Sequence, residues 1–380
     1  MRQNYIERNP KKILIASILI LLLLVIMIAE YSLKTAYPEK VVNYGSQERY
    51  IRLRERNPEF HAYVYPARNE MQYIDGLDSG NKLLRTDRNG FIMPSNIHKD
   101  PDINIVFLGG STTEGEFVDE NNRFPYVVGR TIEEKTGLKV NSFNSGMYGN
   151  NTLHTINILL NKIVPMKPDI AIMMHNINDL SILMHEQTHW NSNSTRSPIA
   201  TINYYSGALR KIKNATIPNL SRELKFHINS IFSSNLSLDE FHNTRDIKLI
   251  VSPDKIIEQF ERNLRLFVSI CKIYNITPIL MTQFNRFSEE PDQVVLDSIR
   301  HPLEKFGMTY EEYRALYNTL NASIINIASN NKILVIDLES KTPKTNKYMY
   351  DSIHLNNVGS LYVTKVISDE LLKLNILRIR

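Results

Sequence analysis

Beyond residue 100 the chain shows a regular series of short apolar runs that are separated by longer polar segments. The runs have the length of strands and lie at 103–108, 139–143, 169–174, 277–282 and 332–337. Most segments between them have the periodicity of helices. Strands that alternate with helices predict a parallel sheet with helices on both faces. We therefore expect an α/β fold with a parallel sheet of about five strands.

Two of the expected helices have clear start signals. Ser252 followed by Pro253 offers an N-cap with proline at the first helical position, which predicts a helix over 255–274. Thr309 and Glu312 have the spacing of a capping box. This second signal predicts a helix that runs to about residue 329.

Residues 13–29 form an apolar run without a single charge. At about 1.5 Å per residue the run is just long enough to cross a hydrocarbon core of about 30 Å. The basic residues before it are Arg2, Arg8, Lys11 and Lys12. This bias predicts a cytoplasmic N-terminus, with everything after Glu30 outside. The long Leu/Ile core and the lack of a clean cleavage site favour an uncleaved anchor over a signal peptide.

The remaining pattern divides the chain into three parts. Residues 1–30 are expected to form the cytoplasmic tip and the transmembrane anchor. Residues 31–100, which are polar and rich in Arg and Tyr, predict a stalk and an irregular lead-in that packs on the main domain. Residues 101–380 form that domain, and a polar stretch at about 181–250 predicts an insertion. Such an insertion is either a lid that shapes the substrate site or a loosely ordered loop.

Composition narrows the possible functions. The chain has 380 residues, a formal charge of +5 and one cysteine. It is long enough to bury a full-sized core, and Cys271 alone excludes an internal disulfide framework. Because Cys271 lies in an apolar stretch, we interpret it as a core residue and not as a nucleophile. Lys and Arg form no dense block, so no nucleic-acid partner is indicated.

A candidate nucleophile follows the first apolar run of the main domain. Ser111 ends the sequence Gly109-Gly110-Ser111, where the end of a strand would expose its hydroxyl. Alone, such a turn can simply be a tight bend. Asp351 and His354 add a base and its orienting carboxylate, which a serine nucleophile needs. They follow the last expected strand and belong at the carboxyl edge of the sheet, where open parallel folds carry their sites.

An acyl-transfer site also needs donors for the oxyanion of its tetrahedral intermediate. The candidates are the backbone N–H of Ser111, a glycine N–H from 144–150 and the side-chain amide of Asn178. Separately, 144–150 could be an ordinary strand-to-helix turn, and Asn178-Asp179 a helix cap. Each segment follows a predicted strand, and this common placement favours the joint assignment. We interpret Asp179 as a residue that holds Asn178 in place.

These segments together resemble the motifs of the SGNH hydrolases, also called GDSL-type esterases and lipases. The family's Gly-Asp-Ser, Asn-x-Gly-x-x-Gly, Gly-x-Asn-Asp and Asp-x-x-His motifs match 109–111, 144–149, 176–179 and 351–354. The resemblance covers roughly residues 85–375 without the insertion. It implies a flavodoxin-like three-layer α/β/α sandwich and an acyl-enzyme mechanism without a cofactor. In that mechanism Ser111 is the nucleophile, His354 the base and then the acid, and Asp351 its orienter.

The resemblance also bears on the oxyanion hole. Alignment of the second motif favours Gly149 over Gly146 as the glycine donor. Two residues depart from the family pattern. Gly110 stands where the family has Asp, which predicts a looser turn, and Asn176 stands where it has Gly, which predicts altered backbone freedom near the oxyanion hole.

A competing motif lies at the start of the predicted insertion. His185, Glu186 and His189 fit the zinc-binding pattern H-E-x-x-H of metalloproteases. The residues at 190–194 are turn-like, and no third-ligand motif follows. Zinc is therefore the minor alternative. We expect the two histidines to line or cap the insertion near the serine.

The expected function is that of a serine esterase that removes O-acetyl or other short acyl groups from an extracytoplasmic glycan. A single-pass anchor would hold it at the periplasmic or cell-surface face of a membrane. Transfer of the acyl group to a glycan by the same triad is the near alternative. A non-catalytic envelope assembly or binding protein on the same fold is the alternative from a different class. Trp190, Tyr204, Tyr205 and Arg210 in the insertion suit sugar binding, although surface placement explains them equally well.

Overall fold

The computed structural model describes residues 9–36, 47–51, 53–66, 70–95, 97–190, 197–203 and 252–377. Arg2, Arg8 and most of the predicted insertion, with Tyr204, Tyr205 and Arg210, lie outside these residues. The chain divides into two compact units. One comprises Met1–Tyr50 and Ala200–Leu238, and the other comprises Ile51–Ile199 and Asp239–Arg380.

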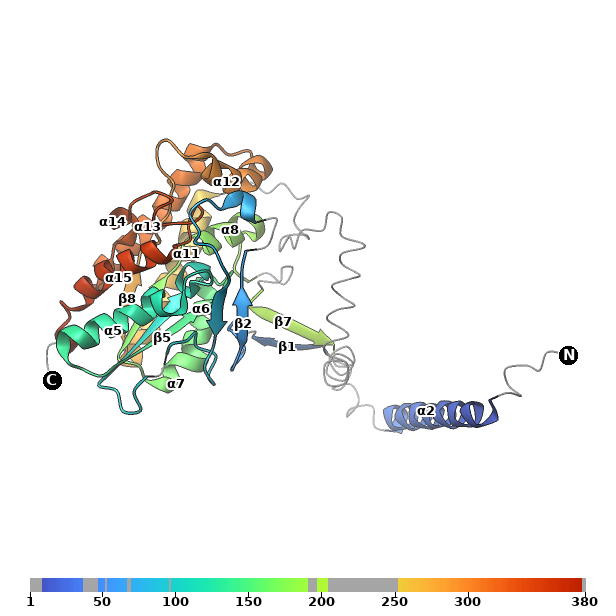
Figure 1. Ribbon diagram of the computed structural model, residues 1–380. Coiled ribbons are helices and arrows are strands. Elements are labelled where there is room, and N and C mark those ends of the chain that lie inside the picture. The colour runs from blue at the N-terminus through green and yellow to red at the C-terminus, as the bar shows by residue number, and fades with distance from the viewer. Residues whose placement is uncertain are drawn as a thin grey trace. The chain divides into compact units, whose positions relative to one another are not determined.

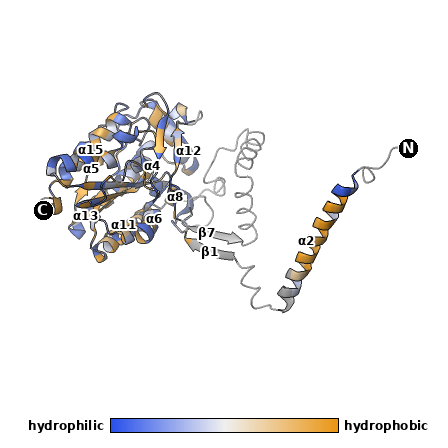
Figure 2. Cartoon of the chain, turned by 60° about the horizontal axis from the view of Figure 1, so that its bottom comes forward, coloured by the Kyte–Doolittle hydropathy of each residue, from blue (hydrophilic) through white to orange (hydrophobic). Residues whose placement is uncertain are grey.

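The first unit contains one long helix, α2 (Pro10–Ala36). Within it, Pro10–Ala29 has a mean hydropathy of 3.0 and no buried residue, and Figure 2 shows hydrophobic colouring over most of the helix. Among the described residues this is the one helix long and apolar enough to cross a membrane, a property it shares with signal sequences. A two-stranded sheet pairs β1 (Gln47–Ile51) with β7 (Ile199–Asn203).

The second unit is built on a five-stranded parallel sheet in the order β5-β4-β6-β8-β9 (Figure 1). Its strands are β4 (Ile103–Gly109), β5 (Val140–Gly146), β6 (Ile170–Met174), β8 (Thr277–Met281) and β9 (Val335–Ile336). Counted along the chain, this is the 2-1-3-4-5 order of flavodoxin-like folds. The predicted fold class is confirmed. The last strand is shorter than predicted, because only two of its residues pair with β8.

Helices cover both faces of this sheet. The side chains of Ile105 and Phe107 pack in one core with α5 (Phe124–Thr136) and α15 (Asn357–Leu371). Those of Val106 and Leu108 face the other core, as expected for the alternation along a strand. The helices of that second core are α6 (Thr152–Ile158), α8 (Ile177–Glu186), α11 (Pro253–Ile273) and α13 (Tyr310–Asn331).

The helix signals in the sequence correspond to helices in the structure. Ser252 is the N-cap of α11, and Thr309 and Glu312 form both hydrogen bonds of a capping box on α13. The remaining helical elements are short or peripheral. They are α4 (Ser111–Glu114), α7 (Val164–Met166), α12 (Gln293–Phe306), α14 (Leu338–Lys341), the π-helix η3 (Leu159–Ile163) and the 3-10 turns η1 (Met71–Tyr73), η2 (Glu120–Asn122) and η5 (Asn375–Leu377).

The described residues between 53 and 95 belong to the second unit and are called the lead-in below. They contain an antiparallel hairpin of β2 (His61–Val64) and β3 (Lys82–Arg85). The side chains of Leu84, Phe91 and Ile92 are fully or almost fully buried. Phe91 packs on Phe143 of β5 with ring centroids 5.0 Å apart. The lead-in therefore contributes to the core of the main domain.

Candidate active site

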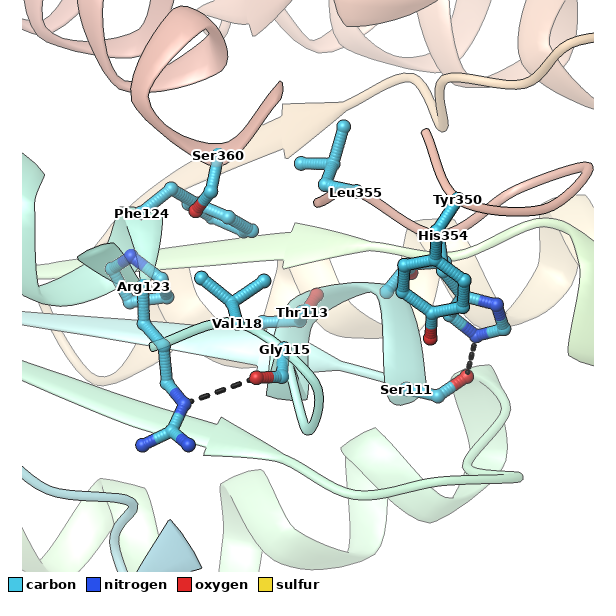
Figure 3. Close-up of a pocket in the computed structure, with 12 residues that line it drawn as sticks. Ser111, Thr113, Gly115, Val118, Arg123, Phe124, Tyr350, His354, Leu355 and Ser360 are labelled. Carbon is cyan, nitrogen blue, oxygen red and sulfur yellow. Dashed lines mark hydrogen bonds between the residues drawn. The ribbon is translucent and has the colours of Figure 1, made fainter. Parts of the chain in front are cut away.

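Ser111 lies at the carboxyl end of β4, where the strand gives way to α4. The short helix ends at Gly115, whose φ of 65° is in the left-handed region that favours glycine. The guanidinium of Arg123 donates to the carbonyl oxygen of Gly115 at 3.0 Å (Figure 3). The same buried group donates to the carbonyls of Leu83 and Met93. Arg123 thus ties the turn behind Ser111 to the lead-in.

Asp351 and His354 lie in the loop before α15 and meet Ser111 at the edge of the sheet. His354 Nε2 is 2.8 Å from Ser111 Oγ (Figure 3), and His354 Nδ1 is 2.7 Å from Asp351 Oδ2. A neutral imidazole that donates through Nδ1 accepts the serine proton at Nε2. The other oxygen of Asp351 accepts from the backbone N–H of Ile353 and His354. The carboxylate is held by its own loop.

An aromatic ring packs against one face of the His354 imidazole and so limits its orientation. Tyr350 is buried and stacks on His354 with centroids 5.5 Å apart and planes 7° apart. The Tyr350 ring also contacts Phe117, with ring centroids 5.8 Å apart. Tyr350 was not predicted from the sequence, because a tyrosine beside an Asp-x-x-His segment has no recognisable role until the loop is folded.

The candidate oxyanion donors lie beside Ser111. Asn178 is in the first turn of α8, and its amide donates to the carbonyl of Asn150 at 2.8 Å. Gly149 has a φ of 71° and lines the same groove as Ser111, Asn178 and His354. The N–H of Gly146 instead donates to Asn144 Oδ1. The geometry therefore favours Gly149 over Gly146 as the glycine donor.

Both departures from the family pattern have structural reasons. A Cβ on Gly110 would come within 2.4 Å of Asn178 Nδ2, so glycine at this position permits a close approach of the amide. Gly110 has a φ of −90°, which other residues also adopt, so the glycine serves packing more than a looser turn. Asn176 is fully buried and donates to the carbonyl of Tyr317 and to Asn321 Oδ1. It anchors the start of α8 to α13.

Asn178→Ala is expected to lower kcat on a small ester by about 10²- to 10³-fold, the usual cost of one oxyanion donor. KM should change little, because the donor acts on charge that develops in the transition state. Gly110→Ala should produce a smaller loss of the same kind, because its methyl displaces the Asn178 amide. Steady-state kinetics on p-nitrophenyl acetate test both. Full kcat in Asn178→Ala would contradict the role.

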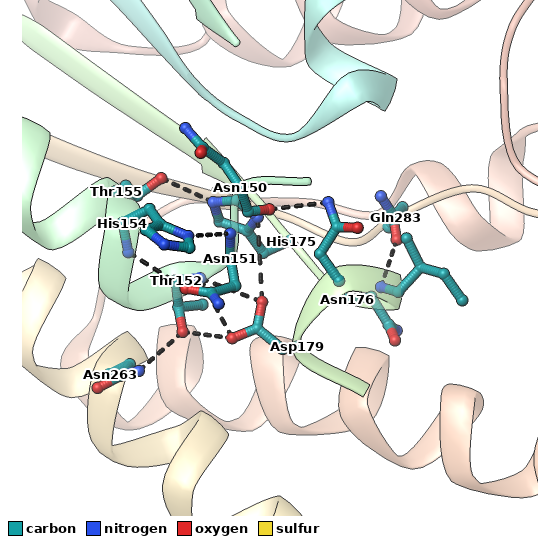
Figure 4. A network of polar contacts seen from close by, with 12 residues as sticks. Asn150, Asn151, Thr152, His154, Thr155, His175, Asn176, Asp179, Asn263 and Gln283 are labelled. Carbon is teal, nitrogen blue, oxygen red and sulfur yellow. Dashed lines mark hydrogen bonds and ion pairs between the residues drawn. The ribbon is translucent and has the colours of Figure 1, made fainter. Parts of the chain in front are cut away.

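A buried polar network supports the two oxyanion segments from behind (Figure 4). Asp179 accepts from the backbone N–H of Thr152 at 3.1 Å, from its hydroxyl at 2.5 Å and from His189 Nε2 at 2.8 Å. Asn263 donates to the Thr152 hydroxyl. Asp179 does not reach the serine. It caps the start of α6 and so joins the segment of Asn178 to the segment that follows Gly149.

The H-E-x-x-H residues do not share one helix. α8 ends at Glu186, and Gln187 takes a left-handed conformation with a φ of 56°. His185 bonds to the carbonyl of Ser181 and stacks on His301, whereas His189 turns into the network of Asp179. Within the described residues, no group of His, Cys, Asp and Glu side chains has the arrangement of a metal site. His185 lines the groove beside Ser111, and His189 is buried beside Asp179. The expectation that both histidines line or cap the insertion falls on a segment that lies mostly outside the described residues.

A groove with a volume of about 930 Å³ opens beside the serine. Its walls come from the lead-in, from the turn after α4, from α8, from α12 and from the loop of His354. A second, much smaller cavity of about 10 Å³ lies behind Ser111 and is the one drawn in Figure 3. The large groove is the one that can admit a substrate, since small-molecule sites commonly have about 300–1,000 Å³.

Two arginines of the lead-in hold the loop of Gly149. Arg54 donates to the carbonyl of Tyr148 at 3.0 Å and to Asn150 Oδ1 at 3.3 Å, and Asn150 donates back to the Arg54 carbonyl. Arg56 lies over the Tyr148 ring and bonds to the buried carboxylate of Glu114 at 2.6 Å. Neither contact was predicted from the sequence, where these arginines appear only as part of a basic, polar stretch.

Burial raises the pKa of Glu114 to about 7, although Arg56 opposes the shift. Because this pKa lies above the value of about 4.5 for an exposed glutamate, the folded state binds the proton more tightly. The stability from this group is present below pH 4.5 and is lost as pH rises toward 7. The loss amounts to about 3 kcal/mol.

Glu114→Gln should therefore flatten the fall in unfolding free energy between pH 5 and pH 8. The measurement is denaturant unfolding at both pH values for the wild type, for Glu114→Gln and for the exposed Glu134→Gln as a control. An unchanged pH dependence in Glu114→Gln, equal to that of the control, would contradict this assignment.

The pKa of His354 is raised above 6.5. Burial lowers this pKa, but the Asp351 carboxylate and the nearby Glu116 and Glu114 together raise it by more than burial lowers it. Since the base must be neutral, kcat/KM is expected to rise with pH, with a midpoint above pH 6.5. Glu116→Gln should move the midpoint to lower pH. A midpoint below 6.5 in the wild type would contradict His354 as the base.

Arg286 positions the loop of Asp351 and was also missed by the sequence analysis. Its buried guanidinium pairs with Asp75 of the lead-in at 2.6 Å and with Asp292. Its backbone N–H donates to the carbonyl of Ser352 at 2.8 Å. The loop that carries the base is therefore tied to the lead-in.

No family model and no curated protein matches the chain. An acetylxylan esterase from Geobacillus stearothermophilus is similar at 16% identity, over 73% of this chain and 97% of that chain, with a TM-score of 0.41. A lipase/acylhydrolase from Enterococcus faecalis is similar at 17% identity, over 71% of this chain and 95% of that chain, with a TM-score of 0.41. A GDSL-like lipase from Bacteroides thetaiotaomicron is similar at 13% identity, over 72% of this chain and 89% of that chain, with a TM-score of 0.37.

Proposed function

We propose that this protein is a serine esterase of the SGNH type that forms an acyl-enzyme at Ser111. The observation that carries the proposal is the continuous series of hydrogen bonds from Ser111 Oγ through His354 to Asp351, at the edge of a groove. The candidate oxyanion donors Gly149 and Asn178 line the same groove.

In the acylation step His354 Nε2 takes the Ser111 proton as Oγ attacks the ester carbonyl carbon. The carbonyl oxygen becomes an oxyanion that accepts from the N–H of Ser111, the N–H of Gly149 and the amide of Asn178. The bond to the alcohol then breaks, and the imidazolium gives its proton to the leaving oxygen. Asp351 stabilises the imidazolium and stays ionised throughout.

The second step repeats the chemistry with water. His354 takes a proton from water, the resulting oxygen attacks the acyl carbon, and the acid leaves as the proton returns to Ser111 Oγ. A sugar hydroxyl in place of water would give acyl transfer with the same residues. The non-catalytic alternative is not favoured, because Ser111 and His354 lie within hydrogen-bond distance.

We place the substrate among short acyl esters, chiefly O-acetyl groups, on an extracytoplasmic glycan. Helix α2 supports a single-pass anchor, with the preceding basic residues in the cytoplasm and the hydrolase unit outside. The proposed domain organisation is therefore an anchor, a stalk and one hydrolase unit that carries an insertion.

The test uses the full chain in detergent with p-nitrophenyl acetate, with and without EDTA, and with a cello-oligosaccharide as acceptor. Release of p-nitrophenol and acetate that EDTA does not reduce is the expected result. Acetyl groups found on the sugar instead of free acetate would favour the transferase. Loss of activity with EDTA would return the zinc alternative, and no activity with any sample would contradict the proposal.

A further inference from the structure

Four exposed tyrosines gather on the walls of the groove beside Ser111. Tyr63 is 69% exposed, Tyr65 48%, Tyr148 45% and Tyr73 37%, and all four line the groove. Three of them belong to the lead-in. Exposed aromatic groups that cluster beside polar residues mark binding surfaces more often than chance placement does. Here they flank the residues of the proposed chemistry.

Two of these rings belong to residues two apart, near the end of β2 and just beyond it. Tyr63 lies in β2, where exposed and less exposed residues alternate, and Tyr65, which is also exposed, follows one residue beyond the end of the strand. Residues two apart on a strand point to the same side, roughly 6.6 Å apart. Such a pair offers two successive ring faces. An extended chain of pyranose rings, whose faces carry C–H groups, can stack on both, because aromatic faces are electron-rich.

The charge of the groove restricts the chain that fits. Its described lining includes the carboxylates of Glu70, Glu116 and Asp351, of which Glu116 pairs with Arg56 and Asp351 with His354, and no Lys or Arg side chain. A polyuronate or a phosphate-bearing polymer would meet like charges at close range, which disfavours binding. The tyrosine hydroxyls and Ser181 and Ser298 can instead bond to sugar hydroxyls.

The volume of the groove points in the same direction. About 930 Å³ is far more than an acetyl group needs. The greater part of the space must therefore hold the alcohol side of the ester, or a long acyl chain. The exposed tyrosines, which carry polar hydroxyls at the rim, favour the alcohol side.

We infer that this groove binds an uncharged glycan chain of at least two sugars, with Tyr63 and Tyr65 as a stacking wall. The inference rests on the proposed esterase function and adds the class of glycan and the residues that recognise it. The lead-in thereby acts in recognition as well as in packing.

Binding is measured apart from catalysis, with the full-length Ser111→Ala variant in detergent. Calorimetric titration uses O-acetylated cello-oligosaccharides of one to four sugars and acetylated oligogalacturonate of equal length. Affinity should rise from one sugar to three and be weaker for the galacturonate. Adding Tyr63→Ala and Tyr65→Ala should weaken binding of the tetrasaccharide by about tenfold. Tyr274→Ala, an exposed tyrosine outside the groove, is the matched control and should bind normally.

Several outcomes would overturn the inference. They are affinity that does not depend on sugar number, equal or tighter binding of the galacturonate, and an equal effect of Tyr274→Ala. In the active enzyme, kcat/KM that increases with acyl length from p-nitrophenyl acetate to p-nitrophenyl octanoate would assign the groove to an acyl chain. Hydrolysis of p-nitrophenyl acetate with no glycan binding would refute this inference alone. Glycan binding without any hydrolysis would refute the proposed function alone.

Discussion

Ser111→Ala is expected to lower kcat on p-nitrophenyl acetate by about 10⁴-fold or more, the largest effect of any single substitution in this protein. The serine supplies the only oxygen that the structure places within reach of His354 Nε2 among the described residues. Without it the acyl-enzyme does not form, and only the oxyanion donors and binding remain. The exposed Ser329→Ala on α13 is the control and should retain full activity.

His354→Ala should reduce kcat by a similar factor, because the nucleophile and its base act as one unit. The double variant should then be little worse than either single variant. Losses that multiply in the double variant would show that the two residues act separately. Retained activity in Ser111→Ala would move the nucleophile elsewhere.

A fragment that begins at residue 101 is expected to fail to fold, in contrast to one that begins at residue 51. The shorter fragment lacks Leu84, Phe91 and Ile92, and each large buried side chain contributes about 2–5 kcal/mol. It also leaves the buried carboxylate of Glu114 without Arg56, and removing one member of a buried ion pair costs about 3–5 kcal/mol. Together these losses come to about 9–20 kcal/mol, as large as the total stability of about 5–15 kcal/mol that domains commonly have.

Circular dichroism and thermal unfolding of the two fragments, expressed side by side, provide the measurement. The fragment from residue 51 should show a cooperative transition, and the fragment from residue 101 should show none. A cooperative transition and esterase activity in the shorter fragment would show that the lead-in is dispensable.

The sheet was predictable because its buried parallel strands, with the exception of the polar-rich β5, are continuous apolar runs. The long helices were predictable because Thr309 forms a capping box and Ser252 precedes a proline at the first helical position. The strand at 332–337 was overestimated, since its apolar residues pack on the core while only Val335 and Ile336 pair with β8. The hairpin of the lead-in was not predicted from the sequence, because its strands have only four residues each and their sequences, HAYV and KLLR, show little alternation of apolar and polar residues.

The candidate triad was found in the sequence because its residues keep a fixed local spacing. Contacts between segments that are distant in the chain leave no such local pattern in the sequence. Arg286 and Asp75 are 211 residues apart, and nothing in either neighbourhood indicates the other. The end of α8 at a left-handed Gln187 was equally hidden, because a glycine commonly marks such a position and none is present. It separates two histidines that a continuous helix would have brought together.

The most direct test of the account is to trap the acyl-enzyme. The full-length protein is mixed with p-nitrophenyl acetate, quenched in acid within the turnover time and digested for mass spectrometry. We expect one added acetyl group on the peptide that contains Ser111, and none on that peptide in Ser111→Ala. Turnover of the ester with the Ser111 peptide unmodified, or with the acetyl group on another residue, would contradict it.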